Sequence, residues 1–142
     1  MIRAVLDTNV LASAAIAHPG TTLATILDNV VANRFDLAIS EYILVELRRT
    51  LATPYYVARI TPAAAARYVQ LLISLGTAVQ ISTSVQGVAT HPEDDPILAT
   101  ALSVRADYLV TGDRRLRDRV PSFQGIPLIS PSEFRDVLSG EA

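Results

Sequence analysis

Short apolar segments alternate with longer segments that carry apolar residues at helical spacing, and this alternation leaves few possible folds. The short apolar segments predict strands over residues 2–6, 35–39, 78–81, 108–111 and 126–129. The longer segments predict helices over residues 10–17, 22–32, 41–51, 63–75, 97–105 and 131–138. Strands that alternate with helices are typical of a parallel sheet covered by helices on both faces. We therefore predict an α/β fold, a three-layer α/β/α sandwich around a central parallel sheet of four to five strands.

No repeat or linker divides the 142 residues, so we expect a single domain over residues 1–142. The chain has no cysteine, which excludes disulfides, cysteine-ligated zinc and cysteine nucleophiles. No apolar run reaches the length of about 18 residues that a membrane span needs. The first residues do not resemble a signal peptide. We expect a cytoplasmic protein with no membrane partner.

All 12 basic residues are arginine, and the net charge is −2. The absence of lysine excludes phosphate-binding P-loops, Schiff-base chemistry and phosphoacceptor receiver domains, which need a lysine. The glycine spacing of a dinucleotide-binding turn is also absent. Because the chain has no overall positive charge, any binding of nucleic acid must come from a local basic patch.

Three acidic residues are predicted to lie at one edge of the sheet. Asp7 follows the first strand, and Asp113 follows the strand over 108–111 after one glycine. Asp95 precedes the helix over 97–105, which descends about 14 Å at 1.5 Å a residue. The next strand rises about 13 Å at 3.3 Å a residue, so the chain returns to the edge that it left. In parallel sheets this carboxyl edge is where ligands bind.

Glu46 is a fourth candidate, because it borders the apolar stripe of the helix over 41–51, where an ionised carboxylate is costly unless something compensates its charge. Carboxylates that converge without a basic partner repel one another and raise at least one pKa. Mg²⁺ or Mn²⁺ would relieve that repulsion, since these ions prefer oxygen ligands. Such a cluster suits the hydrolysis of phosphodiester bonds.

Structural roles also fit these acids. Asp95, with Pro96 after it, and Asp113 are both well placed to cap helices, and Glu46 could be a solvated acid on a helix face. A capping residue can still bind a metal, because its carboxylate has two oxygens.

The chain resembles the PIN-domain family of metal-dependent nucleases. The resemblance rests on four segments, matched in order and spacing: LDTNVLASA at 6–14, SEYILVELRRTL at 40–51, EDDPILATAL at 93–102 and ADYLVTGDRRL at 106–116. The amino-acid sequences of these segments are most similar to those of VapC-like toxins of toxin–antitoxin systems. The resemblance implies a Mg²⁺- or Mn²⁺-dependent endoribonuclease that cuts RNA, an antitoxin protein as partner, and a homodimer.

By motif position the resemblance implies catalytic and metal-binding roles for four acids. These are Asp7, Glu46, Asp95 and Asp113. It also implies supporting roles: Thr8 and Asn9 would orient Asp7, and Thr111 would face the substrate or a metal-bound water. Asp94 competes with Asp95 for the third acidic position, and we prefer Asp95 because it adjoins the helix.

Arginines beside Asp113 form a local basic patch that would contact RNA phosphates. They include Arg114, Arg115 and Arg117. Family members commonly carry an acid where this chain has Arg115, and this departure puts a second metal site in doubt. The alternative function is therefore a PIN-like module that binds nucleic acid or a partner protein without cleaving it.

Overall fold

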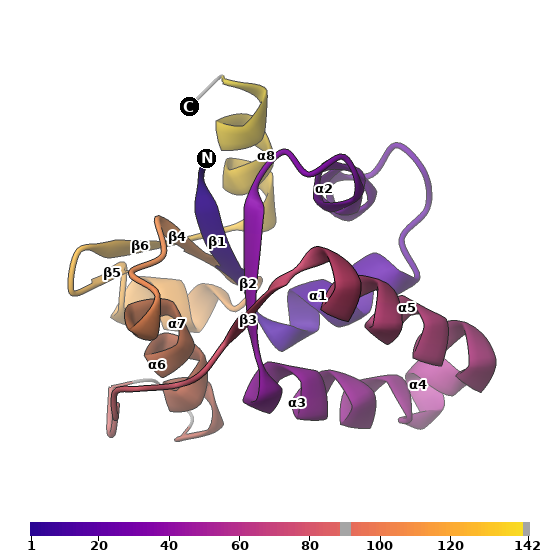
Figure 1. Ribbon diagram of the computed structural model, residues 1–142, viewed down its shortest axis with the longest axis horizontal. Helices are drawn as coiled ribbons and strands as arrows, with labels where there is room; N and C mark the ends of the chain where they lie inside the picture. Colours follow the sequence, from indigo (N-terminus) through magenta and orange to yellow (C-terminus); the bar gives the residue numbers. More distant parts are fainter. Residues whose placement is uncertain (89–91, 141–142) are drawn as a thin grey trace.

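A computed structural model describes residues 1–88 and 92–140 of the chain. Its sheet has six strands in the order β3-β2-β1-β4-β6-β5. The bounds of the strands are β1 Arg3–Leu6, β2 Asp36–Ser40, β3 Thr77–Val79, β4 Tyr108–Val110, β5 Ser122–Phe123 and β6 Ile126–Ile129. Five strands are parallel, and helices flank the sheet (Figure 1). The predicted α/β architecture is confirmed.

The sixth strand is the one that sequence reasoning missed. β5 has two residues and pairs antiparallel with β6. Between them Gln124 and Gly125 both have positive φ, at 48° and 85°, which is the backbone of a type I′ hairpin turn. The five parallel strands agree with the predicted central parallel sheet of four to five strands, and β5 adds an antiparallel strand at its edge. A two-residue strand is too short to show an alternating pattern in the sequence.

The helices follow the predicted order, with small shifts at their ends. Their bounds are α1 Thr8–Ala15, α2 Thr22–Val31, α3 Glu41–Leu51, α4 Pro54–Val57, α5 Pro62–Leu75, α6 Asp95–Ser103, α7 Arg114–Arg119 and α8 Pro131–Ser139, with a 3₁₀ turn η1 at Pro92–Asp94. The short helix α4 was not among the predicted segments, and α7 begins directly after Asp113, which was well placed to cap a helix. In the described residues, no helix is long and apolar enough to cross a membrane.

Side-chain caps explain where several helices begin. The Ser40 hydroxyl accepts a hydrogen bond from the backbone N–H of Ile43 at the start of α3. Thr61 caps α5 in the same way. At the start of α8, Ser130 and Glu133 form a reciprocal capping box. These caps satisfy N–H groups that have no partner inside the helix.

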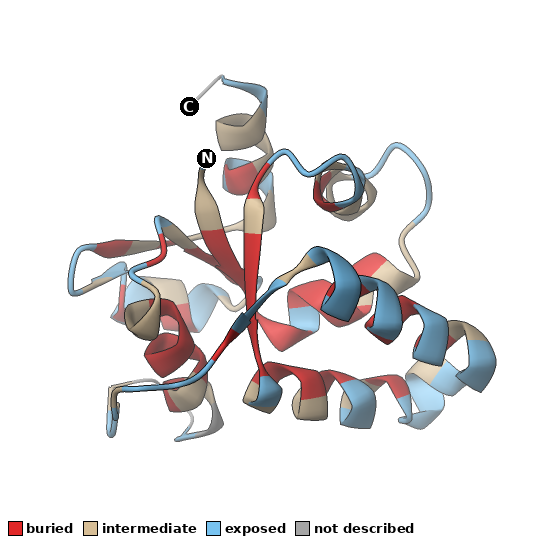
Figure 2. Cartoon of the chain, viewed as in Figure 1, coloured by how far each residue is buried: buried red, intermediate tan, exposed pale blue. Residues whose placement is uncertain are grey.

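The core lies on both faces of the central strands. Figure 2 shows β1, β2 and α6 largely buried, whereas α5 exposes its outer face. α6 packs on β1, β2 and β4, while α1 packs on α2 and α3. Beneath α8, the rings of Phe134 and Phe35 meet edge to face, with 5.0 Å between their centroids. Because the central strands are buried on both sides, their ends are held firmly.

We expect Phe134→Ala to lower the free energy of unfolding by about 3–5 kcal/mol, because it empties a fully buried site. Phe123→Ala, which truncates a half-buried ring in β5, is the matched control and should cost less. Urea unfolding monitored by circular dichroism measures both. Equal losses in the two variants would contradict this account of the core.

Candidate active site

A cavity of about 360 Å³ opens at the carboxyl edge of the central strands. Side chains from α1, α3, α6 and the segments before α6 and α7 converge on it. Its lining residues are Asp7, Thr8, Asn9, Tyr42, Glu46, Thr50, Asp94, Ile97 and Asp113. We call it the acidic cavity. Three of the four predicted acids, together with Asp94, therefore line one space.

Asp7 lies where β1 ends and α1 begins. Its backbone N–H donates to the carbonyl of Val110 in β4 at 2.8 Å, which continues the parallel pairing of β1 and β4 past their last paired residues. The Thr111 hydroxyl donates to the Asp7 carboxylate, also at 2.8 Å. Asp7 is 5% exposed and Thr111 is fully buried. The side chain of Asp7 is thus fixed by the neighbouring strand.

Burial raises the pKa of the Asp7 carboxyl above its ordinary value near 3.8. The hydrogen bonds from the Thr111 hydroxyl and from the N–H groups of Thr8 and Asn9 oppose that rise, since they favour the charged form. The negative charge of Asp113 adds to it. Two carboxylates facing one cavity therefore raise the cost of ionising Asp7, as expected for an acidic cluster without a cation.

The turn after β4 carries Asp113. The Thr111 hydroxyl accepts from the backbone N–H of Asp113 at 3.1 Å, so this hydroxyl joins two of the acids. The Asp113 carboxylate caps α7 by accepting from the N–H of Leu116. Arg117 donates to the Thr111 carbonyl at 2.6 Å. Arg117, predicted to contact substrate, is half-buried here and braces the turn that positions Asp113.

Glu46 reaches the acidic cavity from α3. One carboxylate oxygen accepts from the exposed guanidinium of Arg49 at 2.9 Å. Thr50, one helical turn after Glu46, lines the same cavity. Sequence reasoning did not identify Thr50, although its i+4 spacing from Glu46 places both side chains on one face of the helix.

Asp94 and Asp95 occupy different environments. Asp94 ends the 3₁₀ turn η1 and lines the acidic cavity. Asp95 is 6% exposed, and its carboxylate accepts from the backbone N–H of Gly87 at 2.9 Å. Asp95 does not line the acidic cavity. Its observed contact holds the segment before α6.

The other two arginines of the predicted patch lie at the start of α7. Arg114 is exposed and stands 4.0 Å from Asp118, and Arg115 is exposed as well. Both follow Asp113 within two residues in the sequence. Their charges are available to a ligand that approaches from solvent.

The residues present suit a hard divalent cation by their chemistry. Four carboxylates supply oxygen donors, and the buried Thr8 hydroxyl, which also lines the acidic cavity, has no hydrogen-bond partner among the described residues. In residues 1–88 and 92–140, however, no three acidic or histidine side chains are grouped closely enough to hold an ion as they stand. The oxygen ligands suit such a cation, and the carboxylates would have to move closer together to bind it.

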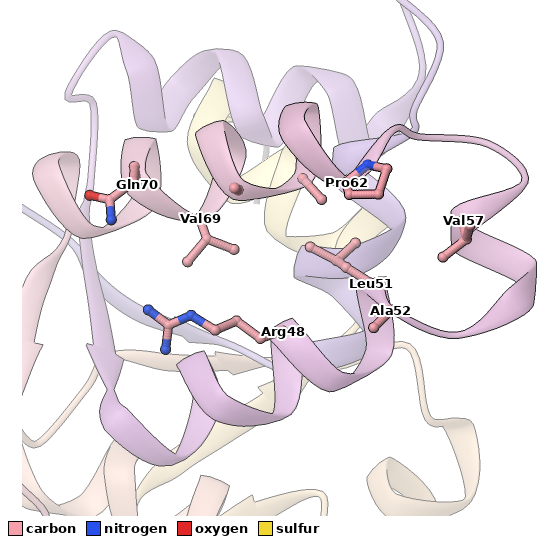
Figure 3. A pocket seen from close by; sticks show the side chains of 9 residues that line it. Arg48, Leu51, Ala52, Val57, Pro62, Val69 and Gln70 are labelled. Carbon is pink, nitrogen blue, oxygen red and sulfur yellow. The ribbon is translucent and has the colours of Figure 1, made fainter.

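A separate, mainly apolar cavity of about 350 Å³ lies between α3, α4 and α5 (Figure 3). Leu51, Val57, Pro62 and Val69 contribute apolar walls, and Arg48 extends along one side. None of its lining residues lines the acidic cavity. The two cavities thus differ in their chemistry.

A family model described as the PIN domain matches residues 3–115. This match spans most of the chain, so the protein belongs to the PIN domain family. The chain matches no curated protein.

Solved structures share the fold at low sequence identity. PAE2754 from Pyrobaculum aerophilum has a TM-score of 0.67 at 19% identity, covering 98% of this chain and 90% of that one. VapBC2 from Rickettsia felis, bound to a DNA fragment from their promoter, has a TM-score of 0.63 at 20% sequence identity. This match covers 91% of this chain and 98% of that one. The PIN domain endonuclease Utp24 has a TM-score of 0.50 at 17% sequence identity, and the match covers 90% of this chain and 84% of that one.

We expect Asp7→Asn to stabilise the metal-free protein at neutral pH. Because the pKa of Asp7 is raised on folding, the wild type loses stability as the pH rises from near 3.8 through the folded pKa. Asparagine carries no charge, so that loss is absent from the variant. In urea unfolding with EDTA from pH 4 to 8, the free energy of unfolding of the variant should increase relative to that of the wild type as the pH rises. A constant difference would contradict the raised pKa.

Proposed function

We propose that this PIN-domain protein is a metal-dependent endoribonuclease that hydrolyses RNA phosphodiester bonds. The observation that carries the proposal is the convergence of four carboxylates from separate segments on one cavity, in a chain that belongs to the PIN family. Asp7 and Asp113 repel one another in this cavity, and a bound cation would relieve that repulsion.

Asp7, Glu46, Asp94 and Asp113 would hold Mg²⁺ or Mn²⁺ in the acidic cavity. The bound ion would lower the pKa of a water molecule and offset the negative charge that develops on the leaving oxygen. The protein's own contribution is positional. Thr111 fixes Asp7 and the backbone of Asp113, and Arg117 fixes Thr111 in turn.

We assign the third acidic position to Asp94 in place of Asp95. Asp94 lines the acidic cavity, whereas the Asp95 carboxylate accepts from the N–H of Gly87. The preference for Asp95 rested on its place beside the helix. In this chain that place directs it to a structural contact.

Arg114 and Arg115 would hold the phosphate backbone beside Asp113. Such contacts position RNA without reading its sequence. The arginine at position 115 also favours the alternative function, a PIN-like module that binds nucleic acid or a protein without cleavage, because it places positive charge where family members commonly carry an acid.

We further propose that the protein is the toxin of a toxin–antitoxin pair, is held inactive by an antitoxin protein, and forms a homodimer. This rests on the resemblance of its motifs to VapC-like toxins, and the fold shared with VapBC2 is consistent with it. The apolar cavity between α3, α4 and α5 offers a surface that a protein partner could cover.

The test of the nuclease is cleavage of a mixed pool of single-stranded RNA. We expect cutting in Mn²⁺ or Mg²⁺, loss of cutting in EDTA, and a loss in Asp7→Asn of about 100-fold or more, since it removes a central ligand. If the wild type binds Mn²⁺ and RNA but cuts no RNA, the alternative binding function replaces this one.

Asp94→Asn and Asp95→Asn are a matched pair, since each replaces one carboxylate by an amide in adjacent residues. Asp94→Asn should weaken Mn²⁺ binding by about tenfold or more, measured by calorimetry. Asp95→Asn should mainly lower the urea midpoint, because it weakens the contact with Gly87. The opposite pattern would restore Asp95 as the ligand.

Arg115→Ala should weaken RNA binding about equally for all sequences and lower the slope of log affinity against log salt by about 1. Arg67→Ala removes the same charge from the exposed face of α5 and is the control. Fluorescence anisotropy across a salt series measures both. An unchanged slope in Arg115→Ala would exclude a phosphate contact at this position.

A further inference from the structure

A third cavity of about 360 Å³ adjoins the acidic cavity. We call it the side cavity. Asn9 and Asp113 line both cavities, so the two lie side by side. The side cavity extends from there towards α2 and the start of α8, where Leu23 and Pro131 form its walls. A molecule held in the acidic cavity can therefore extend into the side cavity.

The walls of the side cavity combine apolar surfaces with a few polar groups. Val10, Leu23 and Pro131 supply apolar surface, and Ser13 and Asn9 supply polar groups. This combination is typical of cavities that bind small molecules. It differs from the acidic cavity, where carboxylates dominate.

Both polar groups have hydrogen-bonding capacity left for a ligand. The exposed Asn9 amide makes no side-chain hydrogen bond within the part of the chain that the structure describes, so it does not hold Asp7 through its side chain. The Ser13 hydroxyl has one long contact, 3.4 Å from the hydroxyl of Tyr56. An amide and a hydroxyl can each donate and accept, which suits the edge of a nucleobase.

The neighbouring acidic cavity favours a nucleotide over a peptide as the occupant of the side cavity. Asp113 lines both cavities, and a cation bound by the acids would attract a phosphate. A nucleotide places a phosphate and a flat, partly apolar base within one residue. It therefore matches a cavity that would hold a cation and an adjoining cavity with apolar walls.

We propose that the side cavity binds an unpaired nucleobase next to the phosphate that the acidic cavity holds, so that Asn9, Ser13 and Leu23 determine which RNA sequence is preferred. The inference rests on the proposed function, since it takes RNA as the substrate. Unpaired bases are the usual targets of sequence-specific RNA recognition, because their edges and faces are accessible.

Leu23→Ala and Leu27→Ala test the base site as a matched pair. Both leucines are half-buried, lie one turn apart on α2 and pack against the core, but only Leu23 lines the side cavity. Binding to short single-stranded homopolymers of A, C, G and U is measured by anisotropy at low salt in Ca²⁺, a cation that also takes oxygen ligands, and a gel of each sample checks that the oligomer stays intact. An oligomer of the same length with abasic sugars is the reference.

We expect the wild type to bind one homopolymer about tenfold more tightly than the abasic oligomer, which is the discrimination that a single apolar contact surface supplies. Leu23→Ala should lose most of this difference, whereas Leu27→Ala should keep it. Equal binding of base-containing and abasic oligomers by the wild type, or equal losses in the two variants, would overturn the base site.

Cleavage in Mn²⁺ separates this proposal from the nuclease. Base-dependent binding without cutting would leave the base site standing and remove the nuclease. Cutting with no base preference, unchanged in Leu23→Ala, would leave the nuclease and remove the base site. Binding of no RNA at all would overturn both.

Discussion

The buried hydroxyl of Thr111 joins the two strands on which the acidic cavity depends. It donates to the carboxylate of Asp7 at the end of β1 and accepts from the backbone of Asp113 beyond β4. This contact is possible only because β1 and β4 pair in parallel, with Leu6 opposite Val110. A shift of one residue in that register would turn Asp7 and Thr111 to opposite faces. The register of one strand pair therefore determines the geometry of the site.

Burial of Asp7 makes its ionisation unfavourable, and the contact with Thr111 offsets part of that cost. Asp7 is buried beside Asp113, and its raised pKa shows that the fold tolerates an unfavourable charge there. Apolar packing offsets this cost, for example under α8 and α6, where Phe134 and Leu98 are buried. The core therefore supports a cavity that holds several like charges. Strain confined to a site within a well-packed scaffold is typical of functional centres.

Sequence patterns predicted the long elements and the edge where the acids gather, because periodicity and strand order follow from many residues at once. They could not separate Asp94 from Asp95. Successive residues of a helix differ in direction by about 100°, so the residue that faces the cavity depends on where the turn η1 meets α6. Sequence patterns also could not predict the hydrogen bond from Arg117 to the Thr111 carbonyl, since it depends on the path of the turn after β4. Short elements such as α4 and β5 lack enough residues to show a period.

The third helix keeps the two main cavities chemically separate through its periodicity alone. Glu46 and Thr50 are four residues apart and share one face, which lines the acidic cavity. Arg48 and Leu51 point to another face, which lines the apolar cavity beside α5 (Figure 3). Since neither set of side chains contributes to the other cavity, substitutions on one face of α3 can change the apolar surface while the acids stay in place. A single helix thus lets the surface beside α5 vary independently of the chemistry at the acids.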